Sequence, residues 1–318
     1  MCYSAQVKQD YQRYIREHGA TLDIQSFVRL FWDRRERPGL RIPKGMTQAF
    51  AGYPGAEGNE IREAIAAWQR EEAARLEQDL FKQRKRLADA ERKLQGRTTK
   101  AATESRRIAT AKVEWLRGRL DDLRRTTSAP EDARIYPGHY CPVLVWEDGA
   151  RVLKPMRYQC RPAGKPAFYD RKFPGTYNAR RDNLEGFWKG QFGHSHGLVA
   201  MTAFYENVSR HRAEGRELAP GEEEQNVVLE FRPEPTQDML VACLWSRWEG
   251  PDGEALLSFA AITDAPPPEV AAAGHDRCVV PIKPANVDAW LNPGTDLAAL
   301  YAILDDRERP YYEHRLAA

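Results

Sequence analysis

A cysteine directly follows the first methionine, in the opening sequence MCYSAQ. Methionine is commonly removed when the next residue is small, and cysteine qualifies. Removal of Met1 would leave Cys2 with a free α-amine and a thiol on adjacent carbons, two nucleophiles at one chain terminus. A terminus is normally exposed to solvent. Cys2 is therefore a candidate covalent nucleophile.

A second stretch, TYNARRDN (176–183), combines an amide with two guanidinium groups in one short loop. Asn178, Arg180 and Arg181 suit contacts with phosphate or sugar oxygens, because guanidinium groups bind such oxygens in a bidentate manner. A structural interpretation is also open, in which Asn178 supports a turn through its own side chain.

Two further stretches place titratable side chains beside apolar runs. Glu206 closes the apolar run 197–206, where partial desolvation would raise the pKa of its carboxyl and suit it to proton transfer. His275, Asp276 and Arg277 precede another apolar run. Histidine titrates near neutral pH, and arginine binds phosphate. The structural alternatives are a solvated glutamate at a strand end and a satisfied His–Asp pair.

Helical elements are expected in the first half of the chain. Residues 8–18 and 23–33 have the periodicity of two short amphipathic helices, whereas 38–58 is rich in Gly and Pro and predicts a loop. Segment 59–125 lacks proline and carries apolar residues at helical spacing on both sides of the sequence QGRTT (95–99). It predicts an antiparallel helical hairpin with arms of roughly 40 Å.

The charge of this hairpin is mildly positive. Residues 57–125 contain 18 Lys/Arg and 13 Asp/Glu. We interpret this excess as a solvated coiled-coil face rather than as a dedicated surface for nucleic acid.

Strands dominate the second half of the chain. Residues 141–158 predict a β-hairpin that turns at Glu147-Asp148-Gly149, and short helices are expected at 287–291 and 296–304. The pattern indicates an α+β fold rich in antiparallel strands, with the helical hairpin inserted near its front. Further strands are expected at 197–206, 226–231, 239–248, 255–263 and 278–282.

Composition limits the class of protein. The chain has 318 residues, 42% of them hydrophobic and 30% charged, with a formal net charge of +2. These values indicate a globular protein, in which attraction to nucleic acid must come from a local patch. Neither a membrane span nor a secretory signal is expected. Five widely spaced cysteines without a CxxC pair predict no disulfide framework and no zinc site, which favours the reducing cytoplasm.

Taken together and in this order, the candidate residues resemble the SOS-response-associated peptidase family, the abasic-site processing proteins. Family members open with Met-Cys, as here with Met1 and Cys2. The resemblance extends over about residues 1–50 and 130–305. It is carried by Asn178-Ala179-Arg180-Arg181-Asp182, Phe204-Tyr205-Glu206, His275-Asp276-Arg277, the run 259–266 and the loop YPGHYCPV (136–143).

The resemblance implies a barrel-like antiparallel sheet with peripheral helices. It implies a discontinuous catalytic domain over 1–58 and 128–318, with 59–127 as an inserted charged hairpin. The expected partner is single-stranded DNA that contains an abasic site, and no cofactor or metal is expected. The implied activity is that of an abasic-site processing protein, with autoproteolytic peptidase and lyase activities.

Roles for individual residues follow from the same resemblance. Cys2 forms a thiazolidine with the sugar aldehyde after Met1 is removed. Glu206 orients the amine and relays protons, His275 protonates the ring oxygen, and Asn178 hydrogen-bonds the sugar. Arg180 and Arg277 bind the flanking phosphates.

The chain also departs from the family pattern. Tyr3-Ser4 stands where members carry Gly-Arg, Tyr158-Gln159 replaces a Trp-Gly, and Asn207 replaces a tryptophan. Two alternatives therefore remain open: a thiol or N-terminal-nucleophile peptidase that uses the same residues, and a non-enzymatic scaffold whose hairpin (59–125) docks a protein partner.

Overall fold

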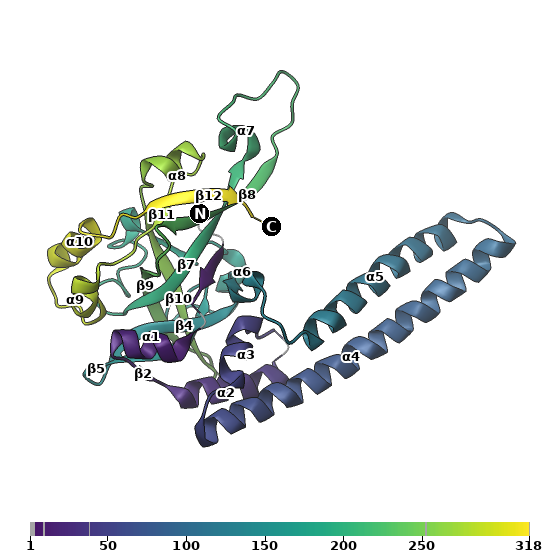
Figure 1. The fold of residues 1–318 in the computed structure, drawn as a ribbon, viewed down its shortest axis with the longest axis horizontal. Coiled ribbons are helices and arrows are strands. Elements are labelled where there is room, and N and C mark those ends of the chain that lie inside the picture. The colour runs from purple at the N-terminus through teal and green to yellow at the C-terminus, as the bar shows by residue number, and fades with distance from the viewer. Residues whose placement is uncertain (1–3, 9, 38, 252, 318) are drawn as a thin grey trace.

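A closed five-stranded barrel forms the centre of the molecule (Figure 1). The structure is a computed structural model that describes residues 4–8, 10–37, 39–251 and 253–317. Neighbouring barrel strands are antiparallel except for one parallel pair, β5 with β10. This arrangement confirms the predicted α+β class and the barrel-like sheet. The barrel strands are β4 (Tyr140–Glu147), β5 (Ala150–Tyr158), β7 (His196–Ser209), β9 (Met239–Glu249) and β10 (Ala255–Asp264).

Both faces of the barrel wall are buried, which explains why its strands are almost continuously apolar. Alternate residues such as Val199, Val241 and Phe259 fill the barrel interior. Their neighbours, such as Leu198 and Ala242, face outward. Helices cover this outer face: α1 (Tyr11–His18) contributes Tyr14, while α9 (Val287–Leu291) and α10 (Leu297–Asp305) contribute Trp290 and Leu300.

Short strands extend the barrel at its edges. The strand β1 (Ser4–Val7) lies between β3 (Arg134–Ile135) and β7, antiparallel to both. The far end of β7 pairs with β8 (Asn226–Glu234), and β8 pairs with the last strand, β12 (Tyr311–Leu316). The remaining strands are β2 (Thr21–Leu22), β6 (Asn178–Arg180) and β11 (Cys278–Val279), of which the last is much shorter than the predicted 278–282.

The two short helices predicted at 8–18 and 23–33 are present as α1 and α2, but the prediction of a loop over 38–58 is wrong. The second helix, α2, spans Ile24–Glu36, and the expected loop contains α3 (Lys44–Ala51) and the start of the long helix α4. Met46 and Phe50 of α3 are fully buried against Phe27. Burial of these side chains therefore outweighs the local Gly and Pro signal.

The helical hairpin is present and projects away from the barrel (Figure 1). Its arms are α4 (Gly55–Gly96) and α5 (Lys100–Arg124), joined by residues 97–99 within the predicted turn. The arm α4 has 42 residues, or about 63 Å at ~1.5 Å per residue, and is longer than expected. The reason is that its first turns pack on α2 and α3 through Ile61 and Ala64.

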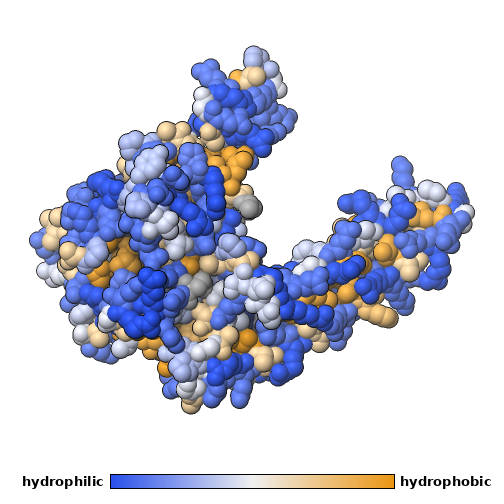
Figure 2. All heavy atoms as spheres, viewed as in Figure 1, coloured by the Kyte–Doolittle hydropathy of each residue, from blue (hydrophilic) through white to orange (hydrophobic). Residues whose placement is uncertain are grey.

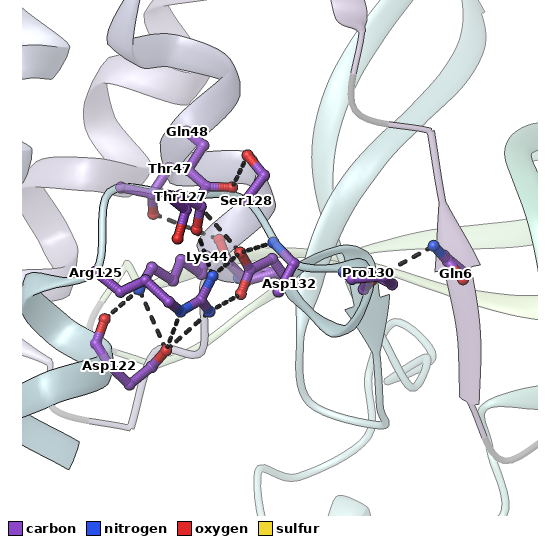
Figure 3. A network of polar contacts seen from close by, with 12 residues as sticks. Gln6, Lys44, Thr47, Gln48, Asp122, Arg125, Thr127, Ser128, Pro130 and Asp132 are labelled. Carbon is purple, nitrogen blue, oxygen red and sulfur yellow. Dashed lines mark hydrogen bonds and ion pairs between the residues drawn. The ribbon is translucent and has the colours of Figure 1, made fainter. Parts of the chain in front are cut away.

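A polar network fastens the base of the hairpin to the barrel (Figure 3). Arg125, which follows α5, donates to Asp122 through Nε and Nη2 and to Asp132 through Nη1 and Nη2. Lys44 of α3 donates to Asp122, and Gln6 of β1 donates to the carbonyl oxygen of Pro130 at 3.4 Å. The base of the hairpin is therefore held against both α3 and β1.

Two projections flank one face of the molecule. The space-filling view shows an open hollow between the helical hairpin and the tip of the β7–β8 hairpin (Figure 2). That tip carries the short helix α7 (Arg210–Ala213). Within the described ranges, no helix is long and apolar enough to cross a membrane.

Candidate functional site

The site is built where β1 meets β7. Cys2 lies outside the described residues, but Ser4 begins β1, is fully buried and pairs with Tyr205, the neighbour of Glu206. Ser4 therefore marks the Glu206 end of the β1–β7 pairing, and Cys2 precedes it by two residues in the sequence.

Glu206 and His275 form a buried pair at this position. His275 Nε2 lies 3.2 Å from Glu206 Oε2, although 69 residues separate them in sequence. The Glu206 side chain is fully buried, and that of His275 is 6% exposed. Glu206 does not close its strand as predicted, because β7 continues to Ser209 and pairs with β8 on the way. Its position inside a strand explains why it is buried rather than solvated.

The chemistry of this pair follows from burial. Burial raises the pKa of Glu206 to about 8 and lowers the pKa of His275. Both shifts favour the uncharged forms, so near neutral pH a carboxylic acid faces a neutral imidazole. His275 Nδ1 lies 2.9 Å from the carbonyl oxygen of Arg277, which suits donation and leaves Nε2 as the acceptor toward Glu206. The pair can hold and pass on one proton.

The backbone around Gly274 fixes the position of His275. Gly274 follows the short helix α8 (Pro268–Ala272) and has φ of +93°, a conformation that favours glycine. A β-carbon there would also meet Cβ of Arg212 at 2.8 Å. A shallow depression of about 370 Å³ lies beside this loop, and Arg212, Gly274, His275 and Asp276 contribute to its lining. Arg212 was missed by the sequence analysis, where only the basic run 210–212 could have indicated it.

Asn178 presents an unsatisfied amide. It lies on β6, is 6% exposed, and both polar atoms of its side chain lack a hydrogen-bond partner in the described part of the chain. Leaving a buried amide unpaired is costly, which indicates a group that the site is built to receive. Its register partner on β10, Ala261, faces the barrel interior, as does Phe204, two residues before Glu206. Strand alternation therefore puts Asn178 and Glu206 on the same side of the barrel wall, although Asn178 is not part of the Glu206–His275 pair.

The predicted phosphate ligands lie at different depths. Arg180 is half-exposed and forms an ion pair with Asp182 at 2.5 Å. Arg277 is 17% exposed, and its Nη2 lies 3.5 Å from Asp276. Arg181, in contrast, is bound by Asp264 and Asp305 and has a structural role. Of the two guanidinium groups in the 176–183 stretch, that of Arg180 is the more exposed.

Arg134 is a further residue that the sequence analysis missed. Its Nε donates to Ser4 Oγ at 3.0 Å, and its guanidinium lies 3.7 Å from the ring centroid of Tyr205. Ser4 on β1 precedes Arg134 by more than a hundred residues, and Tyr205 on β7 follows it by some seventy residues. No local pattern around Arg134 could have indicated them.

The four other cysteines are buried thiols, as expected. Burial raises the pKa of Cys160 to about 12 and raises the pKa values of Cys141, Cys243 and Cys278 as well. Thiols of this kind are poor nucleophiles at neutral pH. Among the described residues, no group of three or more His, Cys, Asp or Glu side chains could hold a metal ion.

Comparison with known proteins gives one family and several similar structures. Residues 95–316 match the sequence profile of the family described as SOS response associated peptidase (SRAP). No curated protein matches the chain.

Three solved structures illustrate the structural similarity. A protein from Bordetella bronchiseptica is 17% identical, with 58% of this chain and 87% of that one covered and a TM-score of 0.46. A protein from Bacteroides thetaiotaomicron is 13% identical, with 58% and 78% covered and a TM-score of 0.46. A phage-related protein from Bordetella bronchiseptica is 20% identical, with 58% and 81% covered and a TM-score of 0.44.

Proposed function

Because the chain belongs to the SOS response associated peptidase (SRAP) family, we propose that it captures abasic sites in single-stranded DNA through Cys2. The capture requires removal of Met1 and produces a covalent DNA–protein crosslink. The observation that supports this proposal most strongly is the buried Glu206–His275 pair, which lies where β1 brings the start of the chain against β7.

The bond-forming steps use both nucleophiles of an N-terminal cysteine. An abasic sugar equilibrates between a closed ring and an open aldehyde. The α-amine adds to the aldehyde carbon, and water leaves to give an imine. The thiol then adds to the imine carbon while its proton goes to the nitrogen, which closes a five-membered thiazolidine. An amine alone would stop at the imine, which water reverses.

The described residues supply proton transfer and binding. The proton held by the Glu206–His275 pair is delivered to the ring oxygen as the sugar opens, and the carboxylate then accepts a proton from the attacking amine. Asn178 satisfies its buried amide by hydrogen bonds to the sugar. Arg180 and Arg277 bind the flanking phosphates.

This function also assigns roles to the parts of the chain. The catalytic domain comprises 1–58 and 128–318, and 59–127 is an insertion. The fastening of the hairpin base through Arg125 and Asp132 supports an insertion that keeps a fixed position relative to the site.

The proposal is tested by incubating the purified protein with a labelled single-stranded oligonucleotide that bears one abasic site. We expect a band of protein plus DNA that survives heating on a denaturing gel. The same oligonucleotide with an intact base is the control and should give no such band. If intact-mass analysis shows that Met1 is absent and the abasic strand still gives no band, the proposal is wrong.

The phosphate contacts predict a change in salt dependence. Arg180→Ala and Arg277→Ala should each weaken binding to single-stranded DNA roughly tenfold, since each removes a charge-assisted hydrogen bond. Each should also reduce the slope of log K against log salt by about 0.7. Fluorescence anisotropy over a salt series measures both effects. Arg92→Ala, which removes an equally charged exposed residue from the hairpin, should change neither; equal effects of all three variants would contradict this assignment.

The description of the family as a peptidase favours a second candidate function. In this reading Cys2, His275 and Glu206 hydrolyse a peptide bond, with release of Met1 as the minimal reaction. Intact-mass analysis of a Glu206→Gln variant distinguishes the two. Retention of Met1 in this variant alone would support autoproteolysis, whereas its removal in both proteins would assign that step to another enzyme.

A further inference from the structure

A charged cleft lies at the base of the helical hairpin, where α2, α4, α5 and β3 meet. We call it the hairpin-base cleft. It has a volume of about 860 Å³. Its lining includes Arg34, Arg41, Trp68, Arg119, Arg134 and His139.

The cleft holds more cations than its carboxylates can match. Eight lysine and arginine side chains line it. Four of them are paired: Arg35 with Glu71, Lys44 with Asp122, Arg75 with Glu72, and Arg125 with Asp122 and Asp132. The other four form no ion pair with any residue that the structure describes. These unmatched cations are Arg34, Arg41, Arg119 and Arg134.

Two of the unmatched arginines are held in place by aromatic rings. The guanidinium of Arg34 lies 3.3 Å from the ring centroid of Trp68, and that of Arg134 lies 3.7 Å from Tyr205. Burial lowers the pKa of Arg34 to about 10, so the group stays charged at neutral pH. Arginines fixed in this way lose little conformational freedom when an anion binds.

A neutral histidine adds a polar group without a partner. His139 lines the cleft, and its buried Nδ1 has no hydrogen-bond partner among the residues described. Burial and the nearby Arg41 lower the pKa of His139 to about 4, so its imidazole is uncharged at neutral pH. The ring can donate a hydrogen bond to a phosphate oxygen or contact a base.

Arg134 connects the cleft to the candidate site. Arg134 lines the cleft and also donates to Ser4, the first residue of β1. Ser4 is two residues from Cys2 and pairs beside Glu206. A polyanion that leaves the site along β3 therefore meets Arg134 first and then the arginines at the base of the hairpin.

From this arrangement we propose that the hairpin-base cleft binds the sugar–phosphate backbone of single-stranded DNA as the strand leaves the Cys2 site. The inference rests on the proposed function for the direction of the strand. Unmatched arginines interleaved with aromatic rings are typical of surfaces that bind single strands without sequence preference. The insertion is thereby part of the DNA-binding surface at its base.

The test uses a Cys2→Ala background, so that binding is measured without crosslinking. Fluorescence anisotropy compares intact oligothymidylates of roughly 4 and roughly 16 nucleotides, a range that spans known single-strand site sizes. The double variant Arg41→Ala/Arg119→Ala removes two exposed cations that make no ion pair, so the fold is preserved. We expect it to lose at least tenfold of the affinity for the long strand and to reduce the salt slope by about 1.4.

Arg92→Ala/Arg107→Ala is the matched control. It removes the same charge from the part of the hairpin away from the barrel, where each arginine pairs only with a carboxylate of its own helix. We expect this control to bind the long strand like the parent protein. Equal binding by both double variants, or no gain in affinity from the short to the long strand, would overturn the inference. A polyglutamate peptide is measured as a second probe. If Arg41→Ala/Arg119→Ala weakens binding of this acidic peptide but not of the long DNA strand, the inference is wrong and the cleft is assigned to a protein partner.

Failure of the cleft and failure of the proposed function are distinguishable. Absence of a crosslink with intact binding of the long strand would reject capture by Cys2 but retain the cleft. A normal crosslink together with equal binding by both double variants would retain capture by Cys2 but reject the cleft as a DNA-binding surface.

Discussion

Cys2→Ala is expected to abolish the heat-stable crosslink to abasic single-stranded DNA completely. The variant keeps an α-amine after removal of Met1, since alanine is also small, but it lacks the thiol that closes the ring. Reaction therefore stops at the imine, which hydrolyses when the sample is heated. The measurement is a denaturing gel run after heating, with intact-mass analysis to verify that Met1 is absent.

A second substitution separates the thiol from the amine. Cys2→Ser should likewise give no heat-stable band, yet treatment with borohydride should trap its imine as a stable amine link. Cys160→Ala serves as the thiol control, because Cys160 is buried and its pKa is raised to about 12. A heat-stable crosslink formed by Cys2→Ala without borohydride would reject the thiazolidine mechanism and point to another nucleophile.

Glu206→Gln is expected to slow crosslinking by roughly 10²- to 10⁴-fold, the usual contribution of a positioned general acid or base. Glutamine has the shape of the protonated carboxyl and can still hydrogen-bond His275, but it cannot release or accept a proton. Single-turnover rates measured on gels report the effect. The rate of the wild-type protein should decline above about pH 8, where Glu206 loses its proton, and that decline should be absent in the variant.

Although Glu206→Gln should slow crosslinking, it should increase the stability of the folded protein at alkaline pH. The pKa of Glu206 is about 8 in the folded protein, above the usual value of 4.5. The folded state therefore binds this proton more tightly than the unfolded state, and the free energy of unfolding falls as the pH rises from about 4.5 to about 8. Glu206→Gln removes this dependence. At pH 8.5 we expect the variant to be more stable than the wild type by on the order of 5 kcal/mol.

Thermal melts at pH 5 and pH 8.5 measure this difference. Glu269→Gln is a suitable control, since Glu269 lies on α8, accepts a hydrogen bond from the backbone of Tyr312 and has no proposed role in proton transfer. A variant that is less stable than the wild type at both pH values would show that Glu206 is ionised and paired in the folded protein, and would reject its role as an acid.

The separate stretches of the sequence predicted the members of the site, but only the fold brings two of them together. Glu206 and His275 each had a structural alternative when considered alone. Their separation of 3.2 Å depends on the pairing of β10 with β11 and on the burial of β7, which are long-range contacts. The buried state of Asn178 is likewise a consequence of its pairing with β10. Local patterns carry no information on such contacts.

Helices with a long run of regularly spaced apolar residues were predicted well, and short helices were predicted poorly. The hairpin over 59–125 and its turn were clear from periodicity and from the absence of proline. The helix α3 was missed because its eight residues lie among glycines and prolines and form only on the apolar surface of α2. The strand β1 was missed because four residues give no alternation to recognise.

The charge of the hairpin shows what composition can and cannot indicate. Several of its arginines pair with carboxylates three residues away, as in Arg92 with Asp89, which fits the predicted solvated face. Of the four unmatched arginines of the hairpin-base cleft, only Arg119 belongs to the hairpin, whereas Arg34 lies on α2, Arg134 on β3 and Arg41 between α2 and α3. No count over residues 57–125 could reveal a cluster to which the hairpin contributes one arginine of four.

The enclosure of β1 between β3 and β7 also sets an order of events during synthesis of the protein. Ser4 cannot pair with Tyr205 until about 200 further residues have left the ribosome. At ~5–20 residues per second this takes on the order of 10–40 s. The proposed function therefore predicts that Met1 is removed within this interval, before β7 pairs with β1.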